Sequence, residues 1–164
     1  MPTSPKTRSR KRVTAKKHVT PPISTESLAQ NFLRADIVFD GLDHSGASFE
    51  ARIFINNPDA DATTELTAQN RYAGRFHVFG HGGCFGDVGH CEVRGTPRPY
   101  DPRPAHPLTP MRKVVIATDA LRKELKRSNK PLTLTIVPVV RSGTDRCDYE
   151  NVLKFDGVSV VTYA

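Results

Sequence analysis

The chain has 164 residues, 37% of them hydrophobic and 25% charged, with a formal net charge of +7. This length suits one domain with a tail, and the absence of any run of about 18 apolar residues excludes a transmembrane helix. The basic N-terminus has no apolar segment behind it, which excludes a secretory signal. We therefore expect a cytoplasmic protein.

The positive charge is concentrated at the N-terminus. Residues 1–20 hold seven of the 24 Lys and Arg and no acid, so the other 17 balance the 17 Asp and Glu. Because residues 1–30 are also poor in apolar side chains, we expect a disordered basic tail followed by one domain over 31–164. The run RSRKRVTAKK could contact nucleic acid or another anionic surface, but it has no interleaved aromatic residues, which favours a solubilising arm.

Apolar residues alternate with polar ones in several short segments. The clearest is 48–56, where Phe49, Ala51, Ile53 and Ile55 share one face. The pattern predicts strands over residues 35–41, 48–56, 72–80, 112–117 and 132–140.

One helix and an ambiguous C-terminus complete the prediction. Thr118 and Asp119 are expected to cap the helix DALRKELKR. The last segment, VLKFDGVSVVTY, is one bulged strand or a hairpin about Asp156-Gly157. Six prolines over 97–110 predict a stiff, ordered loop. The sum is an all-β fold, an antiparallel β-sandwich of six to eight strands with one short helix and long ordered loops.

The residues best suited to chemistry lie in a glycine-rich segment. His81, Cys84, His90 and Cys91 follow the pattern H-x2-C-x5-H-C, and imidazole and thiolate are ligands that copper and zinc prefer. His77 and His44 are additional candidate ligands. The segment therefore predicts a metal site, for copper in preference to zinc.

Other interpretations of this segment stay open. Cys84 and Cys91 could form a local disulfide or be buried thiols. Cys84 could also be a nucleophile with His81 or His90 as its base, but no orienting third group is evident. The hydrolase patterns GxSxG and HExxH are absent. These observations favour a protein that is not an enzyme.

The residues FEARIFINNPDAD and YAGRFHVFGHGG, followed by HPLTP, carry a family resemblance. Residues 35–163 resemble the C-terminal β-sandwich attached to some bacterial tyrosinases and polyphenol oxidases, a cupredoxin-like or immunoglobulin-like domain. The resemblance implies an accessory domain, because the di-copper centre of those enzymes uses six histidines of a separate helical domain.

The resemblance also implies a partner and a contact residue. In that family the accessory domain packs on the catalytic domain, and in some members an aromatic side chain covers the active-site mouth. Phe79 and Phe85 are the candidates here, and the expected partner is a tyrosinase-type catalytic protein. An accessory domain of this kind could also take part in copper handling, at Cys84 and Cys91. The alternative is a mononuclear copper or zinc protein that uses the His/Cys glycine loop, residues 77–91.

Overall fold

Eight strands and one helix make up the part of the chain that the computed structural model describes, residues 12–26, 28, 31–82, 108–128, 130–141 and 148–164. In chain order they are β1 (Arg12–Thr14), β2 (His18–Val19), β3 (Arg34–Leu42), β4 (Phe49–Ile55), β5 (Tyr72–Val78), β6 (Met111–Ile116), α1 (Thr118–Arg127), β7 (Leu134–Arg141) and β8 (Gly157–Tyr163).

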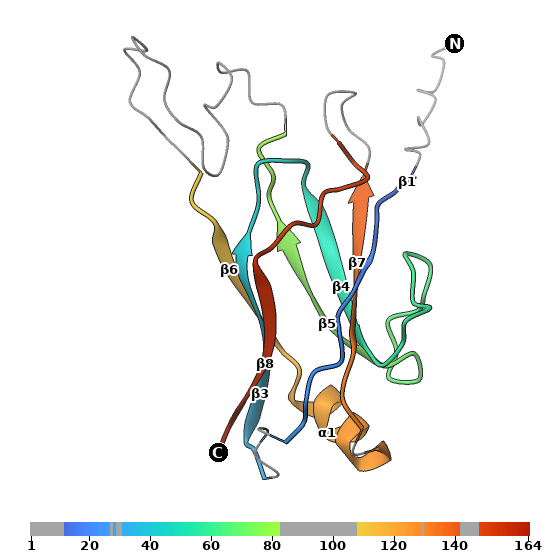
Figure 1. The fold of residues 1–164 in the computed structure, drawn as a ribbon. Helices are drawn as coiled ribbons and strands as arrows, with labels where there is room; N and C mark the ends of the chain where they lie inside the picture. Colours follow the sequence, from blue (N-terminus) through green and yellow to red (C-terminus); the bar gives the residue numbers. More distant parts are fainter. Residues whose placement is uncertain (1–11, 27, 29–30, 83–107, 129, 142–147) are drawn as a thin grey trace, which may run out of the picture.

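The strands form two antiparallel sheets that face each other (Figure 1). One sheet has five strands in the order β1-β7-β4-β5, with β2 also paired to β7, and the other has three in the order β6-β3-β8. The predicted all-β, sandwich-like fold with one short helix is therefore confirmed. Strand alternation builds the core: Ile37 and Phe39 of the three-stranded sheet meet Phe49, Ile53 and other buried residues of the five-stranded sheet.

The two sheets come close together where β5 runs beside β6. Gly74 of β5 has φ 144°, and a Cβ at this position would lie 2.5 Å from Cγ1 of Val115. Both the positive φ and the short distance to Val115 disfavour a side chain at this position. Glycine therefore allows β5 and β6 to come close together and close this edge of the sandwich.

Part of the segment expected to be disordered, residues 1–30, forms two short strands. Arg12–Thr14 and His18–Val19 pair with β7, and the Lys17 Nζ donates hydrogen bonds to the carbonyls of Pro58 and Ala60 at 2.6 and 3.1 Å. Pairing was not expected because this segment is rich in charge, but backbone hydrogen bonds to β7 depend little on side chains. Residues 1–11, with the first part of the basic run, lie outside the described residues, and so do residues 97–107 of the predicted proline-rich loop.

Pro138 accounts for the division of this N-terminal segment into two strands. It lies within β7 between the stretches that pair with β1 and β2, and the register shifts there, with three residues (15–17) opposite two (137–138). Proline has no N–H to donate to a neighbouring strand, so a bulge at this position avoids an unmade hydrogen bond.

The predicted helix is present and is amphipathic, but its cap is not the one expected. Leu121 is buried and Leu125 packs against the core, whereas Ala117 is the N-cap residue and no side chain caps the helix. The Thr118 hydroxyl instead accepts a hydrogen bond from the Ala35 N–H at 3.0 Å, which ties the helix to β3. No helix in the described ranges is long and apolar enough to cross a membrane.

The C-terminal segment is neither a hairpin nor one long strand. Residues 152–156 are irregular, and a single strand, β8, begins at Gly157. Phe155 turns into the core, where its ring meets that of Phe39 at a centroid distance of 5.6 Å. Phe155 is partly buried there and packs against the core.

Candidate functional site

The structure describes three of the seven residues that the sequence predicts for binding. His77, Phe79 and His81 lie at the end of β5 and just beyond it. The other four, Cys84, Phe85, His90 and Cys91, lie outside the described residues.

His77 and Phe79 point away from the core, as strand alternation requires. Their neighbours Phe76 and Val78 are buried, whereas Phe79 is 82% exposed, the largest exposed fraction among the large apolar side chains that the structure describes. The His77 Nε2 lies 3.3 Å from Oε2 of Glu50 on the adjacent strand β4. The two predicted residues therefore share the outer face of the five-stranded sheet.

Glu50 is the centre of a charged cluster on this face. Besides His77, its carboxylate contacts Nε of Arg52 at 2.7 Å and Nη1 of Arg75 at 3.7 Å. Partial burial raises the pKa of Glu50, but the hydrogen bond from Arg52 and the charges of both arginines outweigh it and hold the pKa below its ordinary value. Glu50 is therefore ionised near neutral pH and is a weak base.

A groove of about 360 Å³ runs beside this cluster. It lies over the ends of β4, β5 and β7, and its lining residues are Ser48, Phe49, Glu50, Arg52, His77, Val78, Phe79, Val139 and Val140. An apolar side chain next to fixed charges suits the binding of a protein surface or an extended peptide. We call this groove, with Phe79 at its edge, the Phe79 groove.

His81 meets a second histidine at the same end of the sandwich. The His44 and His81 rings are 5.1 Å apart between centroids, edge to face, and the His81 N–H donates to the His44 carbonyl at 2.9 Å. His77 contacts Glu50 instead. In the part of the chain that the structure describes, no three His, Cys, Asp or Glu residues are grouped to hold a metal ion.

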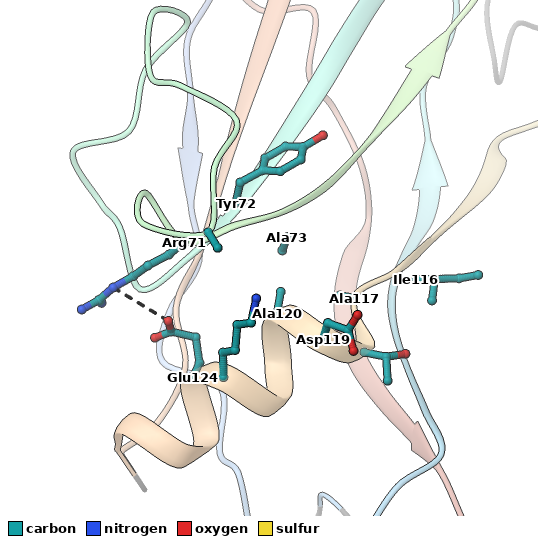
Figure 2. Close-up of a pocket in the computed structure, with 11 residues that line it drawn as sticks. Arg71, Tyr72, Ala73, Ile116, Ala117, Asp119, Ala120 and Glu124 are labelled. Atoms are coloured by element: carbon teal, nitrogen blue, oxygen red, sulfur yellow. Dashed lines mark ion pairs between the residues drawn. The ribbon is translucent and has the colours of Figure 1, made fainter.

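A second pocket, of about 260 Å³, lies at the opposite end, between α1 and β5 (Figure 2). Alanines form much of its wall, and charged groups surround it. The lining residues are Ala68, Arg71, Tyr72, Ala73, Ile116, Ala117, Thr118, Asp119, Ala120, Lys123 and Glu124. Burial raises the pKa of Tyr72, so its phenol stays protonated. The lining residues that the structure describes include no His, Cys or Ser.

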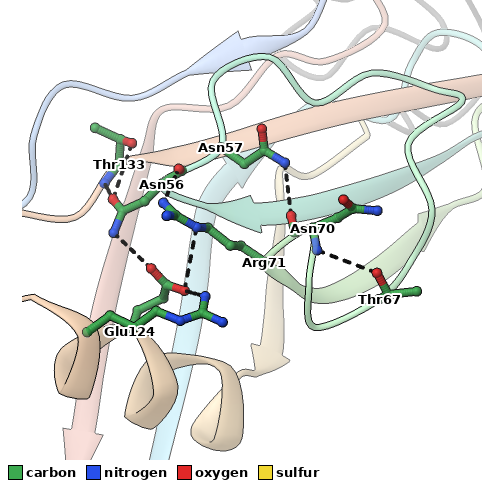
Figure 3. Close-up of polar contacts among 8 residues, drawn as sticks. Asn56, Asn57, Thr67, Asn70, Arg71, Glu124 and Thr133 are labelled. Carbon is green, nitrogen blue, oxygen red and sulfur yellow. Dashed lines mark hydrogen bonds and ion pairs between the residues drawn. The ribbon is translucent and has the colours of Figure 1, made fainter.

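Glu124 links the wall of this pocket to two other segments directly, and to a third through Asn56 (Figure 3). Its buried carboxylate accepts a hydrogen bond from Asn56 Nδ2 at 3.3 Å, is paired with Arg127 one turn along α1 at 2.5 Å, and lies 3.9 Å from Arg71 Nε. Arg71 also donates to the Asn56 carbonyl at 2.6 Å, and Asn56 Oδ1 accepts from Thr133 N–H at 2.8 Å. The contacts join α1 to the ends of β4, β5 and β7.

Backbone strain is concentrated in the same contacts. Asn56 and Arg71, with φ 51° and 61°, are the two described non-glycine residues with positive φ. Left-handed backbone is unfavourable for residues with a Cβ, least so for Asn. This network was not predicted from the sequence, although Asn56-Asn57-Pro58 at a strand end is a pattern typical of such a turn. We call Asn56, Arg71, Glu124 and Arg127 the Glu124 network.

The comparisons with known proteins add no assignment. No family model matches the chain, and neither a curated protein nor a solved structure is significantly similar to it. The resemblance to the tyrosinase accessory domain stays a prediction, and function must be argued from the site itself.

Proposed function

We propose that the chain is a non-catalytic β-sandwich domain that docks onto a protein partner through the Phe79 groove. The observation that carries the proposal is the 82% exposure of Phe79 beside a groove lined by apolar and charged groups. The partner we propose is a copper oxidase of the tyrosinase type, because that is the partner which the sequence resemblance implies.

The exposed aromatic ring of Phe79 would be more stable in an apolar pocket than in water. Transferring a phenylalanine side chain from water to an apolar pocket is favourable by about 2 kcal/mol. Aromatic side chains that fill a partner's pocket dominate many interfaces, while charged groups at the rim set orientation. Phe79 provides the first element, and Glu50 with its cationic neighbours provides the second.

The residues of the Phe79 groove are poorly suited to acid–base catalysis. The Glu50 carboxylate is already paired with Arg52, Arg75 and His77, and its lowered pKa makes it a poor proton acceptor. Binding requires no change in the protonation state of Glu50 or of the arginines, because ionised and paired side chains can recognise a partner's surface directly.

Titration onto a purified tyrosinase catalytic domain that lacks its own accessory domain tests this proposal. Affinity would be measured by calorimetry, and diphenol oxidation by absorbance. We expect binding by the full chain and at least a tenfold weaker affinity for Phe79→Ser, a loss of about 1.4 kcal/mol or more. The matched control is Leu33→Ser, since Leu33 is 77% exposed next to the start of β3, at the other end of the sandwich. Equal affinity of wild type and Phe79→Ser, or no binding at all, would contradict the proposal.

A second candidate function is a mononuclear copper or zinc site, and one contact favours it. His44 and His81 are remote in sequence, yet their rings lie 5.1 Å apart where the His/Cys glycine loop begins. The full ligand set would combine them with Cys84, His90 or Cys91.

Elemental analysis of protein purified without a metal-affinity tag tests this second candidate. About one equivalent of metal is expected in the wild type. It should be lost both in His44→Ala and in the Cys84→Ser, Cys91→Ser double variant. No metal after reconstitution under reducing conditions, or retention in all variants, would exclude this site.

A further inference from the structure

We infer that the Phe79 groove recognises an acidic segment of its partner, an extended stretch in which an apolar side chain and an Asp or Glu lie four residues apart. The apolar side chain packs against Phe79, and the carboxylate pairs with Arg75, which is four residues earlier in this chain. The inference deepens the proposed function, and it rests on the docking role proposed for this groove, not on the identity of the partner.

The charged groups beside the groove carry a net positive charge. Among the described residues that line it, Glu50 is the one acid. Its carboxylate lies 2.7 Å from Nε of Arg52 and 3.7 Å from Nη1 of Arg75. One carboxylate beside two guanidinium groups leaves one positive charge, and His77 adds another when it is protonated. A partner that carries a negative charge is therefore complementary to this surface.

Arg75 is the cation that a partner can reach. Its side chain is 52% exposed, whereas that of Arg52 is 16% exposed. The 3.7 Å contact between Arg75 and Glu50 is also longer than a hydrogen bond. A guanidinium group has a planar fork of N–H donors that matches the two oxygens of a carboxylate. An Asp or Glu of the partner can therefore pair with Arg75 while Glu50 keeps its contact with Arg52.

Strand alternation places the charge and the aromatic ring on one line. Arg75, His77 and Phe79 are at alternate positions along β5 and its continuation, and the Gly80 N–H donates to Ser48 Oγ at 2.9 Å, which keeps the chain beside β4 past the end of β5. Because an extended chain advances about 3.3 Å per residue, Arg75 and Phe79 are roughly 13 Å apart. An extended partner segment spans the same distance in four residues.

The lining of the groove favours a protein segment over a nucleic acid strand. Val139 and the buried side chains of Phe49, Val78 and Val140 are among its lining residues, an apolar surface that suits a Leu or Val of a partner. Proteins that bind single strands stack successive bases on several aromatic rings. Among the described lining residues, Phe79 is the one aromatic side chain that is exposed.

The basic N-terminal run is attached next to the groove. Val13 and Thr14 of β1 pair with Val140 and Val139, which line it. Residues 1–11 precede β1 in the sequence and lie outside the described residues. They contain no acid and four cations, Lys6, Arg8, Arg10 and Lys11. Positive charge tethered at this position should raise the association rate of an acidic partner.

Calorimetric titration of the full chain with three extended peptides of about eight residues tests the inference. Each peptide has one Leu among Ser and Thr residues and carries Glu, Gln or Lys four positions to either side of the Leu. We expect the Glu peptide to bind about fivefold more tightly than the Gln peptide at low salt. The preference should shrink at about 0.5 M salt, because ions screen the pair with Arg75.

Arg75→Glu should reverse the preference, so that the Lys peptide binds more tightly than the Glu peptide. Phe79→Ser should weaken all three peptides, because they share the Leu. The matched control is Arg112→Glu, since Arg112 is also an exposed arginine beside a carboxylate, that of Asp40, but lies on β6 in the other sheet. It changes the net charge by the same amount and should keep the wild-type preference. Circular dichroism checks that each variant is folded.

Several results would overturn the inference. They are no binding of any peptide, equal binding of the Glu and Gln peptides by the wild type, and a preference that Arg75→Glu retains. A preference that Arg112→Glu loses as well would show that the net charge of the chain causes it. Tighter binding of a single strand of oligothymidine than of the Glu peptide, with a loss in Arg75→Glu, would assign the surface to nucleic acid instead.

Titration of the same variants onto the tyrosinase catalytic domain separates this inference from the proposed function. If the wild type fails to bind that domain but prefers the Glu peptide, the proposed partner is wrong and recognition of an acidic segment stands. If the wild type and Arg75→Glu bind the domain equally, while Phe79→Ser binds more weakly, the docking role stands and recognition of an acidic segment is wrong.

Discussion

The two ends of the sandwich differ in how they meet solvent. At the helix end, buried Glu124 joins α1 to the ends of β4 and β5 through Asn56 and Arg71, and Asn56 extends the contact to Thr133 just before β7. At the opposite end, Phe79 is 82% exposed beside the His44–His81 contact. Buried polar networks hold a geometry in place, whereas an exposed aromatic ring gains nothing for the isolated fold. The comparison indicates that the first end stabilises the domain and the second is available for binding.

The largest expected effect is on the helix end. Glu124→Ala removes the partner of Asn56 and Arg71, and we expect the free energy of unfolding to fall by about 3 kcal/mol. Urea denaturation measures the change. The control is Asp119→Ala, because Asp119 is on the same helix but 88% exposed, and its loss should cost less than about 0.5 kcal/mol. Similar losses for both variants would contradict a stabilising role for the network.

Substitutions of Asn56 measure how much backbone strain lowers the stability of the helix end. Asn56→Ala loses the hydrogen bonds to Thr133 and Glu124 and keeps an unfavourable φ of 51°, so we expect a loss of about 2 kcal/mol. Asn56→Gly loses the same hydrogen bonds but relieves the strain, and should be more stable than Asn56→Ala by about 1 kcal/mol. Thermal and urea unfolding of both variants would reveal the difference. A glycine variant no better than alanine would show that strain is not the cause.

The charged cluster near the binding end should respond to acid. The folded-state pKa of Glu50 lies below its ordinary, unfolded value. Its contribution is therefore fully present above the ordinary pKa and is lost as the pH falls through the folded pKa. Between pH 7 and about pH 3, Glu50→Gln should lose about 1 kcal/mol less stability than the wild type. Urea denaturation at the two pH values measures this, and equal losses would mean that the cluster does not stabilise the fold.

The smallest effect on stability should come from Phe79. Because its ring is already 82% in water, Phe79→Ser should change the free energy of unfolding by less than about 0.5 kcal/mol. A loss of binding without a loss of stability would separate the two ends of the molecule. A loss of about 2 kcal/mol or more would instead place the ring in the folded core.

Much of the sandwich could be predicted because strand alternation is a local property. Phe49, Ala51, Ile53 and Ile55 were expected on one face of β4, and all are buried. The same alternation separates exposed Phe79 from buried Phe76 and Val78 at the end of β5. Phe54 is an exception to strand alternation. Its side chain lies on the outer face of the sheet, yet it is buried against Ala60 and Val137. The loop over residues 56–71 folds back onto this face, which no period-2 pattern reveals.

The remaining errors also come from contacts between distant residues. Thr118 was expected to cap its own helix, but its hydroxyl is used by Ala35 of β3. The N-terminal segment was expected to be disordered, yet β7 offered an edge with which it could pair. In both cases a partner remote in sequence competed with the local interaction.

The sequence by itself determined the fold class, the inner faces of the main strands and the absence of hydrolase motifs, since these follow from residue type and spacing within a few positions. The tertiary structure decided which polar groups meet. Asn56 and Glu124 are 68 residues apart and His44 and His81 are 37 apart, yet each pair is in contact. Such contacts depend on how the strands and the helix pack, so the Glu124 network and the surroundings of Phe79 became visible only in the folded chain.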